Sequence, residues 1–215
     1  MGIVRRLTEK PWLAPGADPA GEPDAEGLPL PAAAVGLRIY FGVASVMFLL
    51  IAVTFVMRMD GHGLVTGQQP DWKPMLWPRL LWFNTAVLML SSAAWEWARA
   101  GGARGQMDSL RTGLIAGGVL ALVFLAGQLT VWRQLEDAGC GLTATTMSAF
   151  FYLITALHGL HVLGGLAVWG RTTAKVLAGS EVAEVRQSVD LCAIYWHFLL
   201  LVWLVMFTLF LVNRR

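Results

Sequence analysis

The sequence has little charge. Only 14% of its 215 residues are Asp, Glu, Lys or Arg, whereas 56% are hydrophobic. Because so few charged side chains cannot cover a water-soluble globule of this length, the composition indicates a membrane protein. The net charge of +2 is also too small for a polyanion-binding surface, so nucleic acid is not an expected partner.

Cysteine and catalytic motifs are scarce as well. Cys140 and Cys192 could form one bridge at most, and the topology expected below puts them on opposite sides of the bilayer, so no disulfide is predicted. The sequence holds no CxxC, no HExxH and no Gly-rich phosphate loop. We therefore expect that the isolated chain is not an enzyme, has no catalytic residues and binds no small-molecule substrate of its own.

What the sequence does contain is five long apolar runs. About 20 apolar residues cross the roughly 30 Å of hydrocarbon in a bilayer. The runs are Ile39–Met57, Leu80–Ala98, Thr112–Trp132, Met147–Trp169 and Leu191–Val212. They predict an all-α fold, a bundle of five transmembrane helices in a multi-pass protein.

Residues 1–34 differ from the rest of the chain. They hold six of the nine prolines and no apolar core followed by a small-residue cleavage site. This composition predicts an extended or disordered tail rather than a cleaved signal peptide. Residues 35–215 would then form the membrane domain.

The basic residues set the expected orientation. With the N-terminus inside, ten Lys and Arg residues lie in the inner segments and six in the outer ones. This excess favours an N-inside, C-outside topology. Tryptophans at the ends of runs, such as Trp132 and Trp169, are expected in the interfacial belts.

Small residues mark candidate packing positions. Gly113, Gly117 and Ala121 recur every four residues on the third run, and Gly159 lies on the fourth. Such residues let membrane helices approach closely, although membrane helices are glycine-rich in any case. Five spans without an internal repeat do not divide into two inverted halves, which disfavours a secondary transporter.

Polar residues inside the runs need partners, because an unpaired polar group in hydrocarbon is costly. The side chains concerned are Asn84, Gln128, His158, His161 and His197. We expect them to lie at helix–helix or subunit interfaces. His62, in the outer loop, is expected to be solvated.

The histidines also allow a second interpretation. His161 and His197 each lie about 21 to 22 Å below the expected outer ends of their helices, so they could stand level and join the fourth and fifth spans. Level histidines could instead bind haem or a metal, with His158 or His161 opposite His197. A cytochrome that carries electrons across the bilayer would need two such pairs, so the structural interpretation is favoured and no metal or cofactor is assigned to the chain.

Four segments resemble one known family. Phe150–Gly165 (FFYLITALHGLHVLGG) and Tyr195–Trp203 (YWHFLLLVW) are similar to two signatures of subunit III of the haem-copper oxidases, to which cytochrome c oxidase belongs. Pro78–Ser92 (PRLLWFNTAVLMLSS) resembles its Leu-Trp-x-Asn-Thr segment, and Phe124–Trp132 (FLAGQLTVW) its Gln-containing span. The motif at Tyr195 adds Trp196 to the expected interface positions. The resemblance runs from about residue 36 to the C-terminus, in the short five-helix bacterial form.

The resemblance implies a supporting role in aerobic respiration. It implies a non-catalytic subunit of a bacterial inner-membrane oxidase, an oxidoreductase complex that couples electron transport to proton translocation. The main partner would be subunit I, beside other oxidase subunits, and haem and copper would be held by those partners. Membrane phospholipid between the helices is a further expectation.

Two positions depart from the family pattern. Ser45 is followed by Val46 where many members carry a glutamate, and Leu199 and Leu200 stand where an acid usually follows His-Phe. A proton-related role for those acids is therefore not expected here. Accessory chains of nitric oxide reductases or quinol oxidases are alternatives with the same fold, and the sequence does not distinguish cytochrome c from quinol as electron donor.

Overall fold

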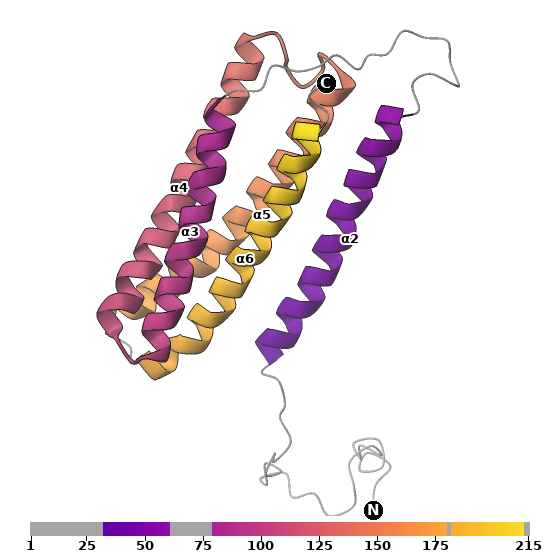
Figure 1. The fold of residues 1–215 in the computed structure, drawn as a ribbon. Coiled ribbons are helices and arrows are strands. Elements are labelled where there is room, and N and C mark those ends of the chain that lie inside the picture. The colour runs from indigo at the N-terminus through magenta and orange to yellow at the C-terminus, as the bar shows by residue number, and fades with distance from the viewer. Residues whose placement is uncertain (1–31, 61–78, 180–181, 213–215) are drawn as a thin grey trace, which may run out of the picture. The chain divides into compact units, whose positions relative to one another are not determined.

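The computed structural model describes residues 32–60, 79–179 and 182–212, and all of the secondary structure there is helical. The helices are α2 (Ala32–Asp60), α3 (Leu80–Ala103), α4 (Met107–Asp137), α5 (Thr146–Leu177) and α6 (Val182–Val212) (Figure 1). Each predicted run lies inside one of them. The all-α class is thus confirmed for the described part of the chain, and the helices extend beyond the apolar runs.

Contacts divide the chain into Met1–Val35 and Gly36–Arg215. The first unit lies almost wholly outside the described residues, as do His62 and the rest of the loop before α3. The tail expected over residues 1–34 is therefore described only at its end. Residues 32–34, its only described part, belong to α2, which begins at Ala32.

Among the described residues, four helices are long and apolar enough to cross a membrane, namely α2, α4, α5 and α6. The shorter α3 is not among them. It has 24 residues and carries Asn84, Ser91, Glu96 and Arg99.

The helices α3, α4, α5 and α6 pack side by side. α3 lies most closely against α4 and also packs on α6, while α5 contacts both α4 and α6. The close approach of α3 and α4 depends on glycine: a Cβ at Gly113 would lie 2.6 Å from the backbone nitrogen of Ala98 and 2.7 Å from the carbonyl oxygen of Ala94. The small residue lets the two backbones touch, as membrane helices require in the absence of a hydrophobic driving force.

Three helices end in the same way. Gly105, Gly139 and Gly179 follow the last residues of α3, α4 and α5 with positive φ of 69°, 75° and 90°. After α4, the N–H of Gly139 bonds to the carbonyl of Glu136 and that of Cys140 to Leu135. This is the Schellman pattern, in which a left-handed glycine satisfies the last helical carbonyls and turns the chain back.

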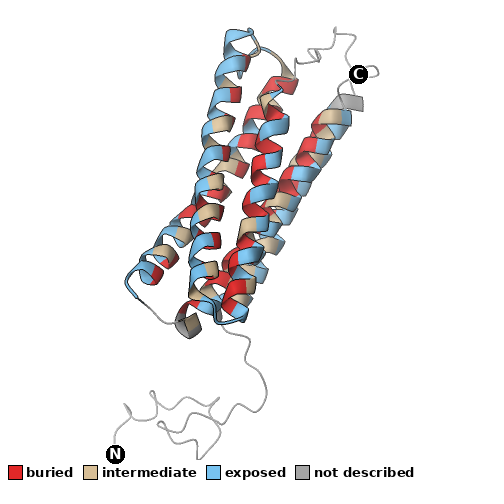
Figure 2. Ribbon diagram, turned by 60° about the vertical axis from the view of Figure 1, so that its left-hand side comes forward, coloured by how far each residue is buried: buried red, intermediate tan, exposed pale blue. Residues whose placement is uncertain are grey.

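The interior is mainly apolar and aromatic. Buried residues lie on the facing sides of the helices and exposed ones on their outer sides (Figure 2). Trp95, Trp196 and Trp203 are among the largest fully buried side chains. In one of the two buried clusters they join α3 to α6.

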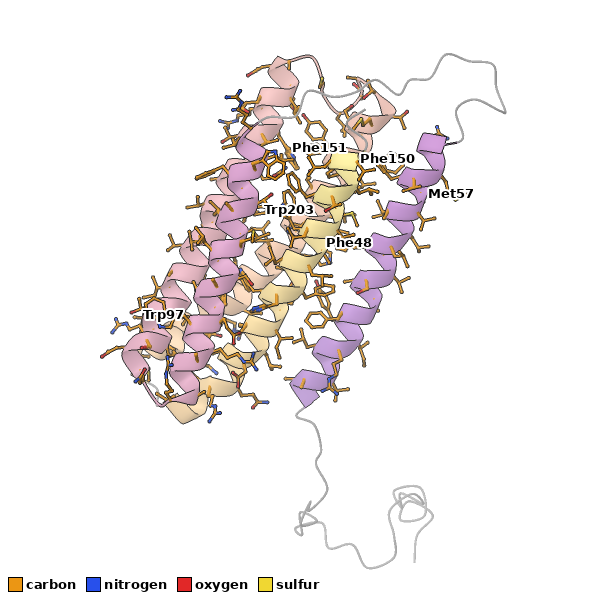
Figure 3. The ribbon with its side chains drawn as sticks, viewed as in Figure 1. Phe48, Met57, Trp97, Phe150, Phe151 and Trp203 are labelled. Carbon is orange, nitrogen blue, oxygen red and sulfur yellow. The ribbon has the colours of Figure 1, made fainter. Side chains whose placement is uncertain are left out.

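α2 is attached through aromatic rings. Phe41 stacks on Phe198 at 4.4 Å, and Phe48 lies 5.3 Å from His161, measured between ring centroids. Phe48 points toward the neighbouring helices and Met57 away from them (Figure 3). The outer side of α2 is a row of exposed apolar residues that includes Val43 and Leu50, which suits a lipid environment.

We predict that Gly113→Ala destabilises the protein by about 1 to 3 kcal/mol, because the added methyl group overlaps the backbone of α3. Gly159→Ala is the matched control, since its Cβ would meet only Leu125 Cδ2 at an ordinary 3.8 Å. Thermal unfolding of the detergent-solubilised protein measures both. Equal midpoints for the two variants would contradict the close contact.

Candidate functional site

Asn84 and Gln128 face each other between α3 and α4. Asn84 Nδ2 donates to Gln128 Oε1 at 3.5 Å, and both residues are buried. Gly127 makes room for this pair, because a Cβ there would collide with the Asn84 amide. About two turns further along α3, Ser91 donates to the carbonyl of Gly117 on α4 at 2.8 Å. The interface between α3 and α4 therefore contains two hydrogen bonds in addition to the glycine contacts.

A buried hydrogen bond also joins α6 to α3. Trp203 Nε1 donates to Thr85 Oγ1 at 3.0 Å, with both groups buried. The indole ring also packs edge-on against Phe124 at 5.0 Å, so that one side chain contacts three helices. Trp203 projects between the helices (Figure 3). Neither Trp203 nor Thr85 was predicted as an interface residue, although a tryptophan in mid-span, whose N–H needs an acceptor, is a usable signal.

α4 and α5 are joined mainly through tryptophan. Trp132 Nε1 donates to Thr155 Oγ1 at 3.1 Å, and Tyr152 returns a bond to the carbonyl of Trp132. At the other end, Trp169 Nε1 donates to the carbonyl of Leu114 at 2.9 Å. These two indoles were expected to lie in interfacial belts. The structure shows that they also form inter-helix hydrogen bonds.

His158 lies fully within the bundle. Its ring is 5.2 Å from Trp203 and 5.8 Å from Phe124. Neither ring nitrogen has a hydrogen-bond partner, and the same holds for Asn84 Oδ1 and Gln128 Nε2. The aromatic rings on either side leave His158 enclosed by protein, so its imidazole is a packing element of the core.

His161 and His197 were expected to join α5 and α6 directly, and the structure does not pair them. His161 Nδ1 bonds to the carbonyl of Leu157 on its own helix, and its ring packs against Tyr40 and Phe48 of α2. The error has a simple physical reason. Residue counting gives the depth of a side chain in the membrane, but not the direction in which it projects from the helix.

The bond that does join α5 and α6 comes from Tyr195. Its hydroxyl donates to the backbone carbonyl of His161 at 2.7 Å and lies 3.3 Å from the Tyr40 hydroxyl. Trp196, the next residue, is fully buried and packs against Trp95 with ring centroids 4.7 Å apart and the rings tilted by 33°. It also lies over Gly165, where a Cβ would be 2.8 Å from the indole ring.

His197 faces α3 instead of α5. Its Nδ1 bonds to the carbonyl of Ala193 at 2.6 Å, and its Nε2 lies 3.9 Å from Glu96 Oε2. Arg99 contacts both Glu96, at 3.4 Å, and Asp190, at 3.5 Å. These four side chains form an exposed row between α3 and α6.

The predicted small-residue positions differ in their contacts. Gly113 meets the backbone of α3 and Gly117 lies against the Trp95 indole, whereas Gly159 has only one ordinary contact. Gly118, which was not predicted, meets the Trp169 ring. Tight contacts thus occur where a glycine faces a backbone or an indole on the next helix.

In the ranges that the structure describes, no three His, Cys, Asp or Glu side chains gather in a metal-binding group. Cys140 and Cys192 are both free thiols, and Cys192 is buried. Among the described histidines, His161 contacts α2, His197 contacts α3, and His158 lies in the bundle core. Their imidazoles therefore do not converge on one haem-sized or metal-sized site.

Long apolar helices joined by buried hydrogen bonds define a multi-helix membrane protein. The family description "Cytochrome c oxidase subunit III" matches residues 66–213. This segment is more than half of the chain, which therefore belongs to the cytochrome c oxidase subunit III family.

Curated relatives carry the same description. The probable cytochrome c oxidase subunit 3 of Mycobacterium tuberculosis is 30% identical over 125 residues, which cover 58% of this chain and 61% of that protein. Cytochrome c oxidase subunit 3 of Thermostichus vulcanus is 26% identical over 84% of this chain and 87% of the relative. The protein of that name from Synechocystis is 29% identical over 79% and 73%. The match to the mycobacterial relative thus spans about three fifths of that protein's length.

We predict that Thr85→Val destabilises the protein by about 1 to 3 kcal/mol, because it leaves the buried Trp203 N–H without an acceptor. Thr208→Val is the control, since Thr208 is exposed and bonds only within its own helix. In the double variant Thr85→Val, Trp203→Phe, the two losses should be less than additive. Additive losses in thermal unfolding would contradict the bond.

Proposed function

We propose that this chain is the non-catalytic subunit III of a bacterial respiratory haem-copper oxidase. In this role it packs on subunit I and supports oxygen reduction coupled to proton translocation. The observation that carries the proposal is the family match over residues 66–213. The names of the Thermostichus and Synechocystis relatives support it over most of the chain.

The internal chemistry of the chain is consistent with this role. Hydrogen bonds join neighbouring helices: Asn84 bonds to Gln128 between α3 and α4, and Trp203 bonds to Thr85 between α6 and α3. Such bonds hold a bundle together and give it a defined outer surface, which is what a bracing subunit needs. Haem and copper then belong to the partner subunits, and the residues of this chain bind neither.

The membrane arrangement follows from the same proposal. α3 crosses the bilayer with the other four helices, since it packs along α4 and α6 and its 24 residues reach about 36 Å. The N-terminus lies in the cytoplasm and the C-terminus outside the inner membrane. The exposed apolar row on α2 contacts membrane lipid.

A haem-binding cytochrome is the rival from another class. It would need His197 and either His158 or His161 to be the two ligands of one haem iron. The packing opposes this, because His158 lies between Phe124 and Trp203 while His197 projects toward Glu96. Large rearrangements of buried aromatic rings would be required.

We predict that the tagged chain, purified from its native membrane in mild detergent, brings with it a larger subunit that contains haem and copper. Mass spectrometry identifies the partner, and optical and metal analysis measure its cofactors. A partner with haem but without copper would favour the nitric oxide reductase alternative.

We also predict that the chain separated from its partners shows no Soret band when haem is supplied. A band that His197→Ala abolishes would instead establish the cytochrome alternative. Comparison with His62→Ala, a histidine outside the predicted spans, controls for non-specific haem binding.

A further inference from the structure

The row of Glu96, Arg99, Asp190 and His197, here named the α3–α6 seam, lies on the outside of the bundle. Arg99 contacts the carboxylates of Asp190 and Glu96, and Glu96 contacts the imidazole of His197. The four side chains remain between 38% and 52% exposed. Their polar atoms are thus only partly satisfied by one another.

The depth of the seam follows from α6. His197 is the middle residue of this 31-residue helix, which is about 46 Å long. Any hydrocarbon layer about 30 Å thick that lies within the length of this helix must include its midpoint. On the predicted runs Leu80–Ala98 and Leu191–Val212, Glu96 and His197 therefore lie just inside the inner edge of the hydrocarbon. Arg99 and Asp190 lie just beyond it.

Lipid is a poor neighbour for this seam. Ionisable side chains within transmembrane segments, as Glu96 and His197 are, almost always face the interior of a bundle or a water-filled cavity, because hydrocarbon cannot solvate them. Here they face outward from this chain. The interior that they face must then be completed by something else in the assembled complex.

The rest of the same face shows what kind of surface this is. Met89 on α3 and Ile194 and Leu201 on α6 are exposed and apolar. A polar patch surrounded by apolar residues is the composition of a helix-packing surface. The outer row of α2 is different, because its exposed residues, such as Val43, are mostly apolar and no charged side chain lies between Arg38 and Arg58.

We propose that a transmembrane helix of another subunit covers the α3–α6 seam and presents a hydrogen-bond donor or a cationic side chain to Glu96. This inference rests on the proposed function, which supplies the other subunits. Charge complementarity selects the occupant: the seam holds two carboxylates and one guanidinium, so its acidic groups outnumber its permanent cation. A donor or cation on the partner would satisfy it.

The test places a photo-crosslinking amino acid at Ile194, between Asp190 and His197 on the exposed side of α6, in the complete complex. The matched control is the same group at Val43 on α2, which is 67% exposed. We expect a crosslink from Ile194 to a different, larger subunit and none to that subunit from Val43. A crosslink from Ile194 to lipid alone or to a second copy of this chain would overturn the inference. So would a crosslink to the larger subunit from Val43 and none from Ile194.

These outcomes separate the two proposals. If the chain purifies with a haem-bearing subunit but crosslinks to it only from α2, the proposed function stands and the assignment of the seam fails. If no such subunit purifies with either variant, the proposed function fails and the assignment fails with it.

A second test changes the carboxylate itself. Glu96→Gln and Glu96→Leu should each lower retention of the chain in the complex about three- to tenfold during detergent washing. Glu136→Gln removes an equal charge at the exposed end of α4 and should have no effect. If lipid covered the seam, Glu96→Leu would leave retention unchanged or raise it, and that result would overturn the proposal. Circular dichroism confirms that each variant keeps its helices.

Discussion

Polar groups in the membrane interior find hydrogen-bond partners only within protein, and this constraint shapes much of the structure. Hydrocarbon offers no hydrogen bonds, and it gives helices no hydrophobic reason to associate. The chain responds with close contacts at glycine and with a few buried bonds. Gly113 brings the backbones of α3 and α4 together, and Trp203 joins α6 to α3 through Thr85.

The same constraint distinguishes the surfaces. α2 offers apolar residues to its surroundings and is tied to the other helices by ring contacts such as Phe41 with Phe198. The opposite case is Glu96, a half-exposed carboxylate beside the midpoint of α6. The first surface suits lipid, and the second is the one that we propose another subunit covers.

Much of this could be predicted from the sequence. Apolar runs of about 20 residues identify the five helices, and the rule that buried polar groups need partners singles out Asn84 and Gln128, which bond to each other. Rotation about the helix axis could not be predicted in this way. His161 and His197 were placed at equal depth, yet they face α2 and α3 respectively, because packing of whole helices decides direction. The close contact at Gly118 could not be predicted for the same reason, since it depends on where the Trp169 ring lies.

The most direct test of the account is a cryo-electron microscopy map of the complex in its native lipid. The account predicts that this chain lies beside a haem-containing subunit, with protein covering Glu96 and His197 and lipid along α2. It also predicts that His158 keeps its place between Phe124 and Trp203. Haem density inside this bundle, with a histidine of this chain as ligand, would contradict it.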